Sequence, residues 1–113
     1  MESAPAQPGP VPKGVTVGFA NASDRAIVVK GYSIVKGQPV PGQLLPMKKD
    51  GKAFEINVPP NAPRFYNVYD ANNPTCVLLQ MKQPLPIPNR DVILIIKTSP
   101  IDPKSVVIVP GSP

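Results

Sequence analysis

Proline occurs eighteen times in this chain of 113 residues, and it recurs along almost the whole length. A proline inside a helix removes a backbone hydrogen-bond donor and clashes with the preceding turn. Between residues 14 and 110, no segment of helical length both lacks Pro and Gly and carries an apolar repeat of 3.6 residues. The prolines therefore predict a fold with essentially no helix.

β-Branched residues indicate what takes the place of helices. Val and Ile together number 23, against six Leu, and their stiff side chains pack well on pleated sheets. Leu, Ile, Val and Phe together make 32 residues and come in runs, which lies above the fraction typical of a disordered chain. A chain of this length suits a single domain with one modest core.

Short apolar runs alternate with turn signals along the chain. This regular spacing predicts an all-β fold, an antiparallel β-sandwich or barrel of about seven to eight strands. The expected strands are residues 14–20, 25–37, 43–49, 52–58, 64–70, 75–82, 91–98 and 104–110. We expect residues 1–13 to form a flexible proline-rich tail, residues 14–110 the sandwich domain, and residues 111–113 a short tail.

Several positions predict local detail. Gly31, in the middle of a long strand, indicates a bulge or a bend, and Pro46 places its strand at a sheet edge. "QPVPG" at 38–42 predicts a break in the chain, and "KDG" at 49–51 predicts a hairpin in which the glycine takes a positive φ. The run 52–58 alternates, so Phe54, Ile56 and Val58 should share one face, and Ala53, Glu55 and Asn57 the other.

The segment "GQPVPGQLLPMKKDGKAFEINVPPNAPRFYNVYD", residues 37–70, resembles the core of transthyretin-like, carboxypeptidase-regulatory-type β-sandwich domains. The resemblance is carried by Gly37, Pro39 to Gly42, Asp50, Gly51, Phe54, and Val58 to Pro60. Asn61 stands where the family has glycine, which is compatible because Asn also visits the left-handed region. The resemblance implies an antiparallel β-sandwich of the immunoglobulin or transthyretin type, and a non-enzymatic module attached to an exported protein. It transfers no functional residues.

The chain contains few of the side chains that catalysis or metal binding requires. Histidine is absent, which excludes His-based triads and His metal ligands. The single Cys76 lies in an apolar run, so it reads as a core residue, and it cannot build a thiolate zinc site alone. The seven carboxylates are spread along the chain, and no two are fewer than five positions apart. We therefore expect no catalytic residue, no cofactor and no metal.

The net charge of +5 suits an acidic partner, but the positive charges are scattered. The tightest group is Lys48, Lys49 and Lys52. Together with Tyr66 and Tyr69, these lysines define a candidate surface for carbohydrate or an acidic polymer. Nucleic acid is disfavoured because a basic stripe with stacking aromatics is missing.

The run "VILII", Val92, Ile93, Leu94, Ile95 and Ile96, lacks polar alternation. It therefore predicts either a central strand buried on both faces or an interface strand that meets a partner.

The missing catalytic side chains and this apolar run favour a non-enzymatic structural or protein-interaction module, an accessory subunit or assembly component. Its partner would be another protein or a second copy of the chain. The carbohydrate- or acidic-polymer-binding module is the alternative.

The apolar runs are too short for a membrane helix, which needs about 20 residues. Residues 2–14, "ESAPAQPGPVPKG", resemble the stretch that follows a removed export signal. An exported, periplasmic or cell-surface location is therefore favoured, and a cytoplasmic one stays open.

Overall fold

The computed structural model describes residues 14–111, and this part of the chain contains β-strands and no helix. Its nine strands are β1 (Val15–Ala22), β2 (Ile27–Val35), β3 (Gln38–Met47), β4 (Lys52–Val58), β5 (Pro63–Asp70), β6 (Asn73–Gln80), β7 (Leu85–Pro86), β8 (Val92–Thr98) and β9 (Val106–Pro110). No helix long and apolar enough to cross a membrane occurs in this range. The tail expected at 1–13 lies outside the described residues, as does most of that expected at 111–113.

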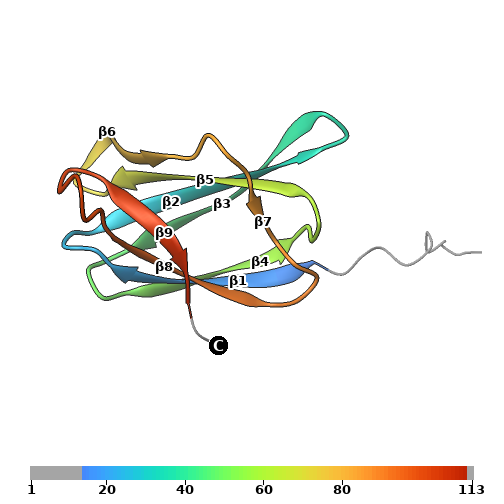
Figure 1. Ribbon diagram of the computed structural model, residues 1–113, viewed down its shortest axis with the longest axis horizontal. Helices are drawn as coiled ribbons and strands as arrows, with labels where there is room; N and C mark the ends of the chain where they lie inside the picture. Colours follow the sequence, from blue (N-terminus) through green and yellow to red (C-terminus); the bar gives the residue numbers. More distant parts are fainter. Residues whose placement is uncertain (1–13, 112–113) are drawn as a thin grey trace, which may run out of the picture.

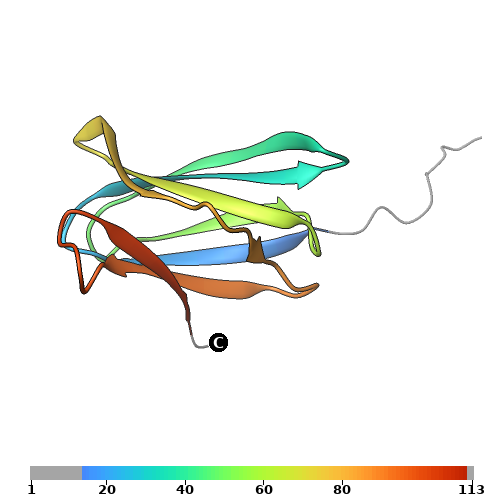
Figure 2. The same cartoon turned by 45° about the horizontal axis from the view of Figure 1, so that its top comes forward.

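The strands form two sheets that face each other as the layers of a sandwich (Figures 1 and 2). Sheet A has the order β4-β1-β8-β9, and sheet B has the order β3-β2-β5-β6, with β7 also paired to β5. All pairings are antiparallel except the one between β1 and β8. The all-β sandwich prediction is confirmed, with one strand more than the upper count expected.

Inward-facing residues of both sheets build one core. In β2 and β5 every second side chain is buried, as a strand with one face inward requires. At the centre, the ring of Phe19 from sheet A meets Tyr66 from sheet B edge to face, with their centroids 5.0 Å apart. Cys76 is half-buried and packs against this core, as its apolar surroundings predicted.

The expected break at 38–42 is wrong, because these residues form the first half of β3. Pro39 and Pro41 are compatible with a strand there since β3 pairs only with β2 and leaves its other side open. A proline is tolerated on such an edge because no partner needs its missing N–H. The prediction that Pro46 lies on an edge strand is confirmed by the same arrangement.

The expected hairpin at 49–51 is also wrong. β3 belongs to sheet B and β4 to sheet A, so the turn connects the two layers. The positive φ falls on Asp50 (63°), whereas Gly51 is not among the residues with positive φ. The buried side chain of Asn21 holds this turn, because its amide nitrogen donates to the carbonyl oxygens of Met47 (3.3 Å) and Lys48 (3.0 Å).

The true hairpin lies at Lys36 and Gly37, between β2 and β3. Both residues have positive φ, 53° and 77°, as a two-residue primed turn requires. A bulge occurs opposite Gly31, but its extra residue is on β3: between the pairs Lys30–Leu44 and Tyr32–Pro41, β2 has one residue and β3 has two. Asn61 has a φ of 62°, in agreement with the left-handed conformation expected there.

The faces of β4 differ from the prediction. Glu55 points into the sandwich, and Phe54 and Ile56 point outward. Asn57 takes a φ of 58° and the pairing with β1 shifts at this point, so Val58 turns inward with Glu55. The expectation that Val58 shares a face with Phe54 and Ile56 is therefore wrong. A carboxylate occupies the interior, and two large apolar side chains lie outside.

Candidate functional site

A cluster of polar side chains lies between the two sheets. We call it the polar cluster; it consists of Ser33 on β2, Glu55 on β4, and Arg64 and Tyr66 on β5. Each of the four is at least 98% buried. Strand alternation places them all inward, so the charged pair Glu55–Arg64 joins sheet A to sheet B.

Hydrogen bonds connect the members of the polar cluster. The Arg64 guanidinium pairs with the Glu55 carboxylate through Nη2 and Oε2. Its Nη1 donates to Ser33 Oγ (2.9 Å) and its Nε to the Tyr66 hydroxyl oxygen (3.2 Å). The Tyr66 hydroxyl in turn donates to Glu55 Oε1 (2.9 Å). Both carboxylate oxygens are thus bonded, as a buried charge requires.

This arrangement shifts two pKa values. Burial raises the pKa of Tyr66 because it disfavours the charged phenolate, and the negative charge of Glu55 raises it further. Burial lowers the pKa of Arg64, but the bonds to Tyr66 and Glu55 outweigh that effect, so the pKa is raised overall. The guanidinium and the neutral phenol therefore persist together.

Two glycines, which have no side chain, make room for the polar cluster. A side chain at Gly42 on β3 would overlap the Glu55 carboxylate and come within 2.6 Å of Arg64 Nη2. A side chain at Gly31 would come within 2.6 Å of the Tyr66 ring. Close approach of the backbone to this cluster is thus a reason for glycine at both positions.

A groove of about 460 Å³ opens between β3 and β4 above the polar cluster. Its walls include Val40 and Ile56, and its floor includes Glu55 and Arg64. The carboxylate and the guanidinium already bond each other and their neighbours, so neither is free to act as an acid, a base or an anion site. The polar cluster is suited to fixing how the two sheets pack.

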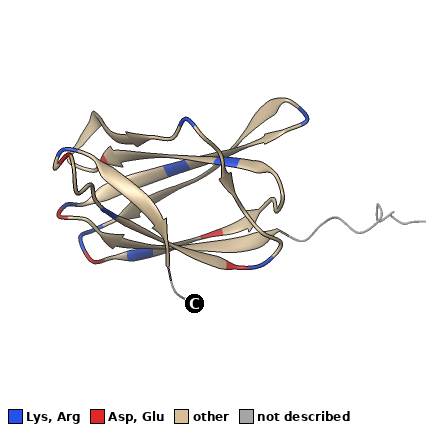
Figure 3. Ribbon diagram, viewed as in Figure 1, with Lys and Arg blue, Asp and Glu red and all other residues tan. Residues whose placement is uncertain are grey.

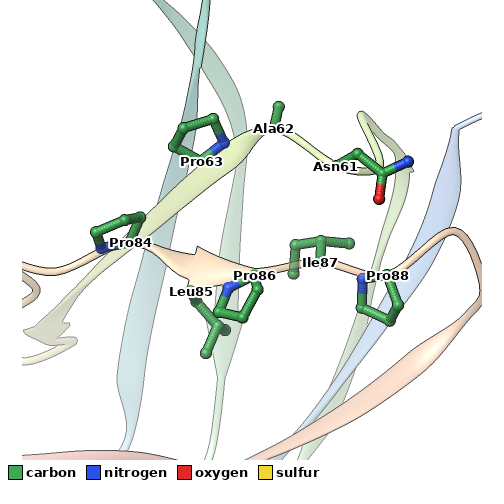
Figure 4. Close-up of a pocket in the computed structure, with 8 residues that line it drawn as sticks. All are labelled: Asn61, Ala62, Pro63, Pro84, Leu85, Pro86, Ile87 and Pro88. Atoms are coloured by element: carbon green, nitrogen blue, oxygen red, sulfur yellow. The ribbon is translucent and has the colours of Figure 1, made fainter.

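A second groove, of about 540 Å³, lies where the corner after β4 meets the strand β7 (Figure 4). The Asn61 N–H donates to the Ile87 carbonyl oxygen (2.9 Å), and Pro63 is paired with Pro86. The lining consists of Asn61, Ala62, Pro63, Pro84, Leu85, Pro86, Ile87 and Pro88. No titratable side chain lines this groove, and Asn61 supplies the one polar side chain of the lining, so its surface offers mainly shape and apolar contact.

The expected carbohydrate surface does not form as a unit. Tyr66 is in the core with no exposed surface, whereas Tyr69 lies three positions further on β5 and points to the opposite face. The expectation that the two tyrosines share an exposed face with the lysines is wrong, because side chains three apart on a strand diverge. Lys48, Lys49 and Lys52 are exposed around the turn that leads into β4.

The run from Val92 to Ile96 lies in β8, which is a central strand and not a sheet edge. It is flanked by β1 and β9, so a partner strand cannot add to it. Leu94 and Ile96 are buried in the core. Ile93 and Ile95 point outward on sheet A, where Ile93 is 42% exposed.

Large apolar side chains are exposed on the outer face of sheet A. Phe54 is 64% exposed and Ile56 is 56% exposed. The register places Phe54, Gly18 and Ile93 side by side, and Ala20, Ile95 and Val109 in the next row. We define the apolar face as Gly18, Ala20, Phe54, Ile56, Ile93, Ile95, Val107 and Val109.

The apolar face is flat at its centre. The Phe54 ring lies over Gly18, so closely that a side chain there would come within 3.2 Å of the ring. That position would also lie 3.7 Å from Ile93. The ring therefore bridges β4 and β8 across the backbone of β1. Sequence alternation grouped Phe54 with Ile56 but did not show which face would be exposed.

Charged residues of both signs, with Lys and Arg in excess, border one end of the apolar face (Figure 3). Lys52 is paired with Ala20, and Lys97 is paired with Val107 on one side and Ala22 on the other. The turn that carries Lys48, Lys49 and Asp50 is bonded to the end of β1 through Asn21 and Gly51 (2.9 Å). Lys48, Lys49, Lys52 and Lys97 therefore lie along this end, together with Asp50 and the ion pair between Asp24 and Arg25.

Among residues 14–111, no group of three or more His, Cys, Asp or Glu side chains is arranged to hold a metal ion. Neither a protein-family model nor a curated protein matches this chain. The resemblance of residues 37–70 to transthyretin-like domains stays a prediction.

Proposed function

We propose that this protein is a non-enzymatic interaction module, an accessory or assembly component that docks on another protein through the apolar face. The observation that carries the proposal is the exposure of Phe54 and Ile56 on β4 and of Ile93 on β8, with Gly18 of β1 between Phe54 and Ile93. Contiguous exposed apolar surface of this kind is typical of protein–protein contact sites.

The polar side chains support a non-enzymatic role. Glu55 and Arg64 are committed to each other and to Ser33 and Tyr66, and histidine is absent from the chain. An enzyme needs a nucleophile, a base or a metal beside a space for substrate. Neither groove combines such a group with room for a substrate. One is lined by proline and aliphatic side chains and by the amide of Asn61, and the other has a floor of mutually paired charges.

Site-specific photo-crosslinking tests the proposal. The full chain carrying benzoylphenylalanine in place of Phe54 is added to an extract of the source cells and irradiated. The matched control carries the same group in place of Leu44, which is 63% exposed on sheet B. We expect a protein adduct at position 54, competed by excess unmodified chain but not by a Phe54→Asp chain, and none at position 44. Equal adducts at both positions, or none at 54, would refute the docking face.

A further inference from the structure

We infer that the partner presents an amphipathic α-helix with acidic residues at one end, which lies along the strands of the apolar face. This inference rests on the proposed function and adds the shape and charge of the occupant. It is carried by the dimensions of the apolar face, by its flat centre at Phe54 and by the lysines at one end.

The width of the apolar face fits one helix. Four strands at about 4.8 Å spacing give a distance of about 14 Å between the axes of β4 and β9, and a helix with its side chains is about 10–12 Å across. Along the strands, the rows from Ile56 to Val107 cover about six residues, or about 20 Å. A helix of about 13 residues has that length. A sheet face and a helix stripe are the layers that commonly pack together.

The charged residues around the apolar face indicate the charge and the orientation of the partner helix. Lys52 and Lys97 are on the apolar face's own rows, and Lys48 and Lys49 adjoin them. At the opposite end Arg90 and Asp91 offset each other, and Asp91 accepts a hydrogen bond from the Thr16 N–H (2.9 Å). Glu or Asp near one helix end would therefore find complementary charge only beside the lysines. The negative end of the helix dipole is its C-terminus, so that end should lie there.

A second copy of this chain fits the apolar face less well. Each copy carries a net charge of +5. The apolar face of a second copy is bordered by the same lysines, so it does not supply an acidic cluster for the lysine end of the first. Face-to-face packing that superposes the two lysine ends brings like charges together, which costs binding free energy. Packing in the opposite direction places the lysines over Arg90 and Asp91, whose charges offset. An acidic partner removes this difficulty.

Fluorescence anisotropy with a defined probe tests the inference. The probe is a stapled, labelled helical peptide of about 14 residues, with Leu at the i, i+3, i+4, i+7 positions and Glu concentrated in its last turn. One control peptide has the same composition with alternating Leu and Glu, and a second has Lys in place of Glu. The full chain is titrated into each peptide, and so are the Phe54→Asp and Leu44→Asp variants.

We expect saturable binding of the acidic helix alone. Phe54→Asp should weaken it by about tenfold or more, which corresponds to 1.4 kcal/mol, and Leu44→Asp should leave it unchanged. Lys97→Glu should weaken the acidic peptide and strengthen the basic one. Circular dichroism of each variant verifies that it remains folded.

The inference is overturned by equal binding of the alternating peptide, by failure of all peptides to bind, or by a chain that dimerises through the apolar face. Dimerisation is measured by light scattering and is abolished by Phe54→Asp if the apolar face is responsible. Binding to phosphatidylserine vesicles that depends on Phe54 would also overturn it. An adduct at position 54 in the crosslinking experiment, together with no helical-peptide binding, would leave the docking proposal intact and remove only the helix.

Discussion

Arg64 links the two layers of the sandwich through its side chain. It bonds Glu55 on sheet A and Ser33 and Tyr66 on sheet B. A buried ion pair gains little over apolar packing, because both charges lose their hydration. Its loss on one side only is costly, since the remaining charge stays buried without a partner. The polar cluster therefore specifies how the sheets sit together more than it adds to stability.

Substitution of Arg64 measures this coupling. We expect Arg64→Met to lower the free energy of unfolding by about 3–5 kcal/mol, because the Glu55 carboxylate is left buried and unpaired. The double variant Glu55→Leu with Arg64→Met should be more stable than Arg64→Met alone. Urea unfolding of the wild type, both single variants and the double variant gives the coupling energy. Additive losses would show that the two side chains do not depend on each other.

Tyr66 makes the stability fall at alkaline pH. Its pKa is raised in the folded protein, mainly by burial, so the folded state keeps the phenolic proton that the unfolded chain releases above about pH 10. The contribution of Tyr66 is fully present below that pH and decreases as the pH rises further, by about 1.4 kcal/mol per unit.

The measurement compares urea unfolding at pH 9, 10 and 11 for the wild type and for Tyr66→Phe. Titration of the remaining groups is common to both proteins and cancels in the comparison. We expect the wild type to lose stability more steeply above pH 10 than the variant does. Parallel curves for the two proteins would contradict a buried, proton-retaining Tyr66.

At the scale of the strand, the limits of β4 and most of β8 followed from local pattern. The run 52–58 alternates and is bounded by a turn signal and two prolines, and β4 has these same limits. The pattern did not show which side chains of β4 point into the core. Glu55 is inside because Arg64 and Tyr66 on β5 supply its partners, and a pattern within one strand contains no information about a partner on another.

Strand pairing was equally beyond the local pattern. The run "VILII" indicated either a central strand or an interface, and the choice depends on β1 and β9 lying on its two sides. The connection after Met47 crosses between sheets because Asn21 binds the turn. The prolines of β3 indicated a break, yet an open edge accommodates them. In each case a contact distant in sequence decided the outcome.

The molecule as a whole places a charged pair inside and large apolar side chains outside on sheet A. The interior charges are compensated by hydrogen bonds, and the apolar face is compensated by nothing within the described chain. A surface of this kind costs solubility when left bare. Its exposure beside four lysines is the reason for assigning the protein a docking role.

Hydroxyl-radical footprinting tests directly whether the apolar face is covered. The purified chain and the protein in an extract of its source are oxidised, and trypsin then releases peptide 53–64 with Phe54 and peptide 37–48 with Leu44. The ratio of oxidation at Phe54 to that at Leu44 removes differences in radical dose. We expect this ratio to be severalfold lower in the extract than in the purified chain. An unchanged ratio would mean that the apolar face stays bare among its natural partners, and it would contradict the docking role.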